Sequence, residues 1–199
     1  MTKSVEFLFD IGSPAAYIAW TQMPRIAKET GAHIDYQPIL LGGVFQATSN
    51  RSPTEVAPKG RYMMDDLGRF ARRYDVPFAN NPFFPINTLM LMRGATAFQM
   101  RETDRFIGYC DAMYRAVWVE GRNMNDPAVV GAVLQQAGFD AQSFLALTAD
   151  PEVKEKLKTV TQNAVTRGVF GAPTFFVGED MFWGQDRLDF VQEALKATP

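Results

Sequence analysis

The sequence predicts an α/β fold in which a βαβ unit opens the chain, a ββα unit closes it, and a large all-helical insertion separates the two. Three observations lead to this prediction. An apolar run at residues 5–9 is followed by a helical pattern at 14–29 and a strand pattern at 33–38. Residues 59–168 show helical spacing almost throughout. After Gly168 the pattern changes to strand, turn, strand and helix.

The first unit has clear start and stop signals. After the strand at 5–9 the chain turns at Gly12, and Ser13 and Pro14 occupy the N-cap and first position of the helix. Pro24 lies inside this helix and is expected to kink it. Gly31 ends it, and the second strand should run parallel to the first through a right-handed crossover.

The middle of the chain begins with a turn-rich connection at 41–57, for which we expect a loop. The helical patterns that follow cover residues 59–74, 87–102, 104–118, 126–136, 141–147 and 151–166. We therefore predict one domain made of residues 1–40 and 169–199. Residues 41–168 form the connection and the helical insertion domain.

The last unit consists of a strand at 173–177, a hairpin turn at 178–180, a return strand at 181–183 and a terminal amphipathic helix at 187–197. Pro173 opens the strand, where its missing N–H costs little. Because sequential strands usually lie side by side, these two strands should join the sheet of the first unit.

Composition limits the classes of function. The chain has 199 residues, of which 47% are hydrophobic, and a formal net charge of −2. A nearly balanced charge without long basic runs argues against nucleic-acid binding. No apolar stretch is long enough to cross a membrane, and Asp10 interrupts the only N-terminal apolar run, so we expect a cytoplasmic protein.

Cysteine and histidine are scarce. The single cysteine, Cys110, lies in a helical pattern and is expected to be a small buried hydrophobe, and no internal disulfide can form. The single histidine, His33, begins a strand. The sequence therefore predicts no metal site and no nucleophile–histidine pair.

Ser13 is the first candidate functional residue. A helix N-terminus stabilises an anion, including a thiolate. Redox proteins of the thioredoxin type carry a Cys-x-x-Cys pair at this strand–turn–helix junction, whereas residues 13–16 here read SPAA. Any thiol chemistry must therefore use a thiol that a ligand brings. The plain alternative is that Ser13 only caps the helix.

Ala172-Pro173 is the second candidate feature. Taken alone, the segment leaves a trans or a cis peptide bond open. The βαβ–ββα order favours the thioredoxin arrangement, in which a cis-proline loop faces the first helix. A cis bond would leave the backbone N–H and C=O of Ala172 available to an extended peptide ligand.

Five ordered motifs give the chain a resemblance over its whole length: FDIGSP at 9–14, APKGRYM at 57–63, FPINTL at 84–89, VFGAPT at 169–174 and FWGQDR at 182–187. They resemble the 2-hydroxychromene-2-carboxylate isomerases and the closely related kappa-class glutathione transferases. The resemblance implies a thioredoxin-like fold split by a helical insertion, glutathione as the cofactor, a small aromatic-derived substrate and a homodimer.

The resemblance also implies roles for individual residues. Ser13 would contact the glutathione sulfur as the catalytic residue. The other expected glutathione contacts are Asn50, Lys59, Ala172, Pro173, Gln185 and Asp186. Phe84, Asn87 and Trp183 would line the pocket of the organic substrate.

Most of these positions have a plain structural alternative. Asp186 could cap the terminal helix. Asn87 could cap the helix predicted at 87–102. Asn50 is also a common turn residue, and Lys59 could be a solvated lysine at a helix start. Phe84 and Trp183 could be ordinary core residues.

The resemblance predicts a glutathione-dependent isomerase that acts on 2-hydroxychromene-2-carboxylate or a similar intermediate by reversible thiolate addition. Basic residues that grip the substrate carboxylate in the isomerases are missing from the matching stretches, 42–45 and 52–54. Two alternatives therefore stay open: a kappa-like transferase or peroxidase, and a non-catalytic module that binds thiol peptides.

Overall fold

The structure is a computed structural model that describes residues 3–197. Within this range one sheet has the strand order β2-β1-β3-β4, formed by β1 (Ser4–Phe9), β2 (His33–Pro38), β3 (Thr174–Val177) and β4 (Asp180–Trp183). β1 pairs in parallel with β2 and antiparallel with β3, and β3 pairs antiparallel with β4. The sheet therefore joins the two ends of the chain at its centre, as the sequence predicts.

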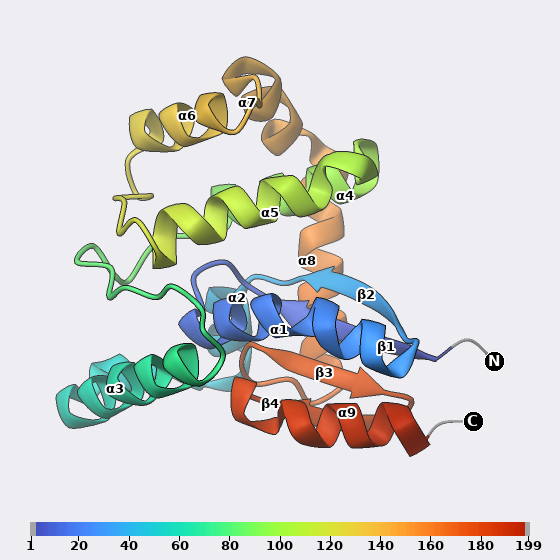
Figure 1. The fold of residues 1–199 in the computed structure, drawn as a ribbon. Helices are drawn as coiled ribbons and strands as arrows, with labels where there is room; N and C mark the ends of the chain where they lie inside the picture. Colours follow the sequence, from blue (N-terminus) through green and yellow to red (C-terminus); the bar gives the residue numbers. More distant parts are fainter. Residues whose placement is uncertain (1–2, 198–199) are drawn as a thin grey trace.

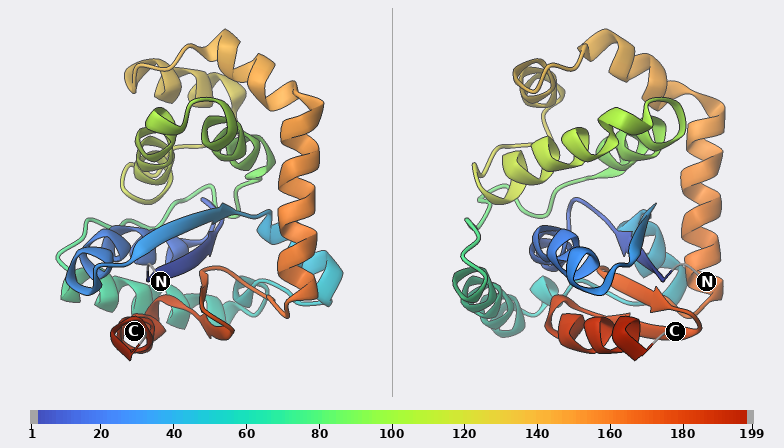
Figure 2. Two further views of the ribbon diagram at one scale, coloured as in Figure 1. Left: turned by 90° about the vertical axis from the view of Figure 1, so that its right-hand side faces the viewer. Right: turned by 45° about the vertical axis from the view of Figure 1, so that its right-hand side comes forward.

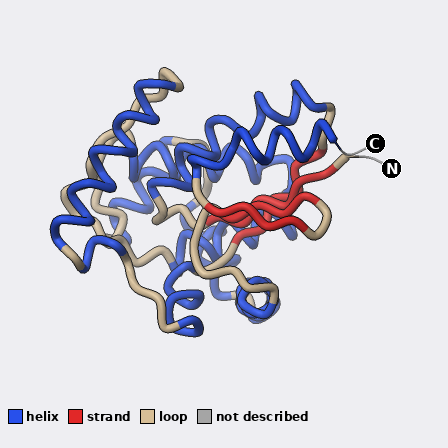
Figure 3. Tube along the Cα trace, turned by 90° about the horizontal axis from the view of Figure 1, so that it is seen from below, coloured by secondary structure: helices blue, strands red, loops and turns tan. Residues whose placement is uncertain are grey.

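Helices cover both faces of the sheet (Figures 1 and 3). The side chains of Phe7 and Phe9 point into the main core with α1 (Pro14–Thr30) and α9 (Leu188–Ala197). Leu8 points the other way, into a smaller core that it shares with α2 (Leu41–Thr48) and α8 (Pro151–Thr166). This alternation follows from the two-residue period of a strand.

The remaining helices are α3 (Ala57–Arg73), α4 (Leu89–Arg101), α5 (Thr103–Trp118), α6 (Pro127–Gln136) and α7 (Ala141–Ala149), with short 3-10 turns η1 (Pro53–Glu55) and η2 (Gln185–Arg187). Helices α4 to α7 stack above the sheet, whereas α3 lies near α1 (Figure 1). Helix α8 runs from this stack down to the sheet (Figure 2). The domain boundaries at 40–41 and 168–169 stay a prediction.

The predicted helices and strands are confirmed to within two residues at most boundaries. The expectation of a loop at 41–57 is wrong, because α2 and η1 occupy most of this stretch. Helix α1 continues through Pro24. Among residues 3–197, no helix combines the length and the apolar character that a membrane span requires.

Candidate functional site

The N-terminus of α1 carries Ser13 in a buried position, with 4% of its surface exposed. Its Oγ accepts a hydrogen bond from the Ala16 N–H at 3.1 Å, so Ser13 is the helix cap. The same hydroxyl donates to the backbone C=O of Ala172 at 2.8 Å. Ser13 thus joins the first helix to the loop that precedes β3, 159 residues later in the chain.

The loop before β3 contains a cis peptide bond between Ala172 and Pro173, which confirms the arrangement that the βαβ–ββα order favours. The Ala172 C=O accepts the Ser13 hydroxyl in this structure, and its availability to a peptide ligand stays a prediction. The Ala172 N–H has no acceptor among residues 3–197. One backbone donor therefore stands beside Ser13 without a partner.

Asn50 and Trp183 both lie against this loop. The Asn50 side-chain N–H donates to the C=O of Phe170 at 2.9 Å. The Trp183 ring lies 5.1 Å from the Phe170 ring, and its Nε1 would be 2.5 Å from a Cβ at Gly171. Only glycine at 171 allows Trp183 to approach so closely.

Gln185 and Asp186 lie in η2, which packs beside α1. Gln185 is buried, with 8% of its surface exposed, yet its side-chain amide has no hydrogen-bond partner within residues 3–197. The Asp186 carboxylate pairs with Arg187 and lies over Gly184, and it does not begin α9, which starts at Leu188. The ion pair between Arg187 and Asp186 was not anticipated from the sequence.

The other predicted residues are not joined to Ser13 by a direct contact. Lys59 lies exposed in the first turn of α3 and has no ion pair within the described chain. The Asn87 side chain accepts from the Leu89 N–H at 3.1 Å, one residue before the N-cap Thr88 of α4, while its backbone N–H donates to the Asn125 side chain. Phe84 packs on Trp118 with ring centroids 5.6 Å apart.

Comparison with known proteins identifies the family of this chain. The model of the DSBA-like thioredoxin domain matches residues 4–196. The chain belongs to the DsbA-like thioredoxin-domain family. Its serine and its cis-proline loop meet at the junction between β1 and α1.

The chain is also similar to individual proteins whose activities are named. The chain is 34% identical over 197 residues to a 2-hydroxychromene-2-carboxylate isomerase of Sphingobium xenophagum, covering 98% of this chain and 99% of that protein. It is 25% identical over 207 residues to human glutathione S-transferase kappa 1, covering 98% and 92%. A solved structure of a 2-hydroxychromene-2-carboxylate isomerase has a TM-score of 0.84 and 29% identity, covering 96% of this chain and 94% of that one. These relatives are enzymes, which supports an enzyme function.

This member of the DsbA-like family has no cysteine at the junction. Its one cysteine, Cys110, is fully buried in α5, as predicted. Burial raises the pKa of the Cys110 thiol well above its usual range, and the nearby Asp111 charge adds to the effect. Cys110 is therefore a protonated and inaccessible thiol in α5. The side chain at the start of α1 is the hydroxyl of Ser13.

Asp10 is the residue at this junction that the sequence analysis did not recognise. It is 1% exposed, and its carboxylate accepts from the N–H groups of Gly12 and Leu41, each at 2.8 Å. Burial raises the pKa of the Asp10 carboxyl above its usual value, against the lowering effect of these N–H groups and of Thr88. The sequence feature that could have indicated its role is an acidic residue directly after an apolar strand and before a turn.

Side chains of the insertion hold the same turn from behind. The Trp118 Nε1–H donates to the C=O of Ile11 at 2.8 Å, and the Met92 sulfur accepts from the Ile11 N–H at 3.3 Å. Tyr114 donates to the C=O of Asp10 at 3.5 Å. Helices α4 and α5 therefore fix the backbone that carries Ser13.

Proposed function

We propose that this protein is a glutathione-dependent isomerase that acts on 2-hydroxychromene-2-carboxylate or a similar aromatic intermediate. The observation that carries the proposal is the contact between the Ser13 hydroxyl and the cis-proline loop at the N-terminus of α1. A hydroxyl donor and a helix N-terminus together favour a thiolate, although this chain has no thiol there. The named isomerase and transferase relatives support the same function.

Four further groups would supply the contacts of a peptide-like ligand such as glutathione. The Ala172 N–H lacks an acceptor, and it would pair with the cysteinyl part of the ligand. The Gln185 residue is 8% exposed and its side-chain amide makes no hydrogen bond within residues 3–197, so the amide is available to a ligand. Asp186 and Gln185 would bind the γ-glutamyl end, and Lys59 would attract a carboxylate as a point charge. Asn50 would support ligand binding by holding the Phe170 C=O in the loop before β3.

Ser13 has to change partners when the ligand binds. In the structure its hydroxyl donates to Ala172, so the donor must rotate toward the sulfur. The released Ala172 C=O would then accept from the ligand backbone. One internal hydrogen bond is thus exchanged for two with the ligand, while the helix end favours the ionised sulfur.

Bound glutathione would supply a thiolate that adds to a double bond of the organic substrate and is eliminated after rotation or ring opening. The chain's own contribution is to keep the sulfur ionised at Ser13, to position it through the cis-proline loop, and to hold the substrate nearby. Trp183, Phe84 and Asn87 would line the substrate side.

Replacement of Ser13 by alanine tests the proposal. We expect Ser13→Ala to lower kcat for hydroxychromene isomerisation at least about tenfold, because the sulfur loses its donor, while calorimetry shows a smaller loss in glutathione affinity. Asp126→Ala is the matched control, since it removes the cap of α6 far from the junction. Both variants should lose about 1 kcal/mol of stability. Full activity in Ser13→Ala would reject the role of the serine.

A kappa-like transferase is the second candidate function. It is favoured by the similarity to glutathione S-transferase kappa 1 over almost the whole chain and by the missing basic residues at 42–45 and 52–54. Analysis of the products separates the two reactions. An isomer formed with glutathione unchanged supports the isomerase, and a stable conjugate supports the transferase. The homodimer and the cytoplasmic location remain predictions.

A further inference from the structure

We propose that a cavity between α3 and residues 78–80 binds a planar aromatic carboxylate, with Arg72 as the group that holds the carboxylate. The inference rests on the proposed function, since this acid would be the organic substrate of that reaction. It assigns the substrate's charge to a residue outside the stretches that carry basic residues in the isomerases.

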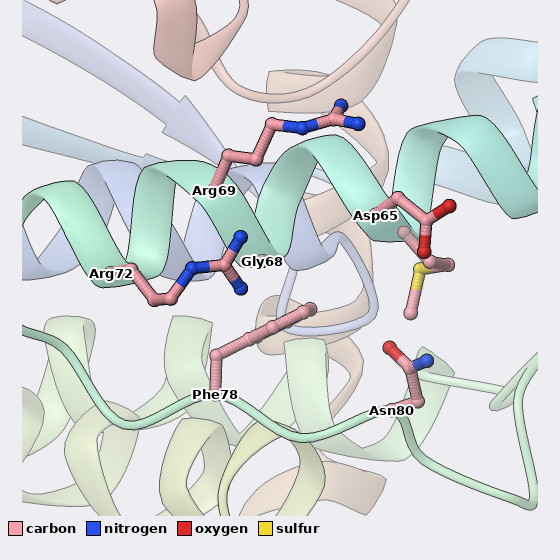
Figure 4. A pocket seen from close by; sticks show the side chains of 7 residues that line it. Asp65, Gly68, Arg69, Arg72, Phe78 and Asn80 are labelled. Carbon is pink, nitrogen blue, oxygen red and sulfur yellow. The ribbon is translucent and has the colours of Figure 1, made fainter.

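The cavity has a volume of about 420 Å³ and is lined by Met64, Asp65, Gly68, Arg69, Arg72, Phe78 and Asn80 (Figure 4). This volume falls in the usual range for small-molecule sites. Helix α3 forms one wall, and the segment that follows it forms the other. Both polar and apolar groups face the space.

The apolar side of the cavity is held in place by ring stacking. Phe78 stacks on Tyr17 with centroids 6.4 Å apart and on Trp118 with centroids 6.1 Å apart. The Met64 thioether adds a polarisable surface, and Gly68 leaves the helix surface flat. A fixed ring opposite a flat helix surface suits a planar aromatic ligand.

Arg72 is the cation that remains for a ligand. Arg69, which also lines the cavity, is engaged by Asp66 at 3.1 Å and by the Tyr62 ring beneath its guanidinium. The Arg72 guanidinium has neither an ion pair nor a hydrogen bond among residues 3–197. Its Nη1 would be 3.6 Å from a Cβ at Gly68, so the guanidinium lies along the helix toward the cavity.

The charges favour a single carboxylate over a more highly charged group. Asp65 lines the same wall as Arg72 and repels additional negative charge. An arginine fork matches the two oxygens of a carboxylate, and the Asn80 amide offers a further donor. A monoanionic aromatic acid therefore fits better than a phosphate dianion.

Tyr17 of α1 links the wall of the cavity to the helix that Ser13 begins. Tyr17, which supports Phe78, lies one helical turn after Ser13, and its N–H bonds to the Ser13 C=O at 3.0 Å. The Tyr17 hydroxyl also donates to the C=O of Pro77 at 2.6 Å. A ligand against Phe78 would therefore rest on a ring that Tyr17 supports from the first turn of α1.

Calorimetric titration with 1-naphthoate, in the absence of glutathione, tests the inference. We expect Arg72→Gln to weaken binding about tenfold or more, because a charge-assisted hydrogen bond is lost. Arg73→Gln, the adjacent residue outside the cavity, is the matched control and should bind like the wild type. Arg72→Lys should recover part of the affinity, since it restores the charge without the fork.

Three results would overturn the inference: equal naphthoate affinity in Arg72→Gln and the wild type, equal affinity of the wild type for the neutral 1-naphthylmethanol, or equally strong binding of inorganic phosphate. Glutathione binding is measured separately on the same samples. Arg72-dependent naphthoate binding in a protein that does not bind glutathione would reject the proposed function and support the pocket.

Discussion

The Ser13 hydroxyl donates to the Ala172 C=O at the point where two distant segments meet. A serine at an N-cap normally needs only to accept from the helix, and Ser13 does so with Ala16. Its hydroxyl proton is therefore available for a second task. In the free protein that task is to hold the cis-proline loop, and in the proposed complex it is to hold a sulfur.

Asp10 determines the shape of the turn before Ser13. One carboxylate oxygen accepts from Gly12 within the turn, and the other accepts from Leu41 at the start of α2. Tyr114 and Ser13 bond to the backbone C=O of the same residue. A neutral amide at this position could accept from only one of the two N–H groups without turning its own NH₂ toward the other.

We expect Asp10→Asn to destabilise the protein by about 1–3 kcal/mol, because one buried N–H loses its acceptor. The loss should depend on pH. Because the folded pKa of Asp10 is raised above 3.8, the carboxyl stabilises the fold below that pH and loses this contribution as pH rises through the folded pKa. Urea unfolding from acid to neutral pH should therefore show a stability gap between wild type and variant that narrows with rising pH. A gap that widens would contradict the shift.

At this scale the sequence predicts residues whose role is local and misses those whose role depends on distant partners. Ser13 and Pro173 are recognisable from neighbouring residues, since caps and strand starts follow local rules. Asp10 becomes significant only when Leu41 and Thr88 reach it. Arg72 is one of several arginines on α3 until the fold places Phe78 opposite it.

Helix α2 shows how a distant contact decides an element. Its first residues include Gly42 and Gly43, which are poor helix formers, and Leu40 provides no side-chain cap. The Asp10 carboxylate caps the helix at Leu41 instead, and Thr161 of α8 accepts from the Leu40 N–H at 3.0 Å. Val44 then enters the smaller core. Neither cap is visible in the local sequence, so a loop was predicted.

Two glycines within the insertion helices allow the effect of packing to be distinguished from the effect of helix propensity. A Cβ at Gly94 of α4 would meet the Tyr109 hydroxyl and the Phe144 ring, so Gly94→Ala should cost about 1–3 kcal/mol through overpacking. A Cβ at Gly108 of α5 meets nothing within 4 Å. Gly108→Ala is the matched control and should add about 0.5–1 kcal/mol. Thermal unfolding of both variants measures the difference, and a neutral Gly94→Ala would show that Tyr109 moves without cost.

The whole molecule is arranged around the turn that carries Ser13. The main core continues from the sheet residues Phe7 and Phe9 into the insertion, where it includes Phe98 and Phe144. The order of strands and helices was predictable because each element has its own period and end signals. The packing of α4 and α5 against the turn was not, since it depends on pairs such as Trp118 and Ile11, 107 residues apart.

Two buried tryptophans test whether the insertion positions the site. Trp118 donates to the turn at Ile11 (2.8 Å), whereas Trp20 donates to Asp111 (2.7 Å), away from it. Replacement by phenylalanine removes one N–H donor in each case, and we expect both variants to lose about 1–3 kcal/mol of stability. Only Trp118→Phe should also lower kcat/KM for the isomerisation, because the Ile11 backbone can then shift and displace Ser13. Urea unfolding and steady-state kinetics at a temperature where both variants are folded measure the two effects. Equal kcat/KM values would show that the insertion stabilises the fold without positioning the serine.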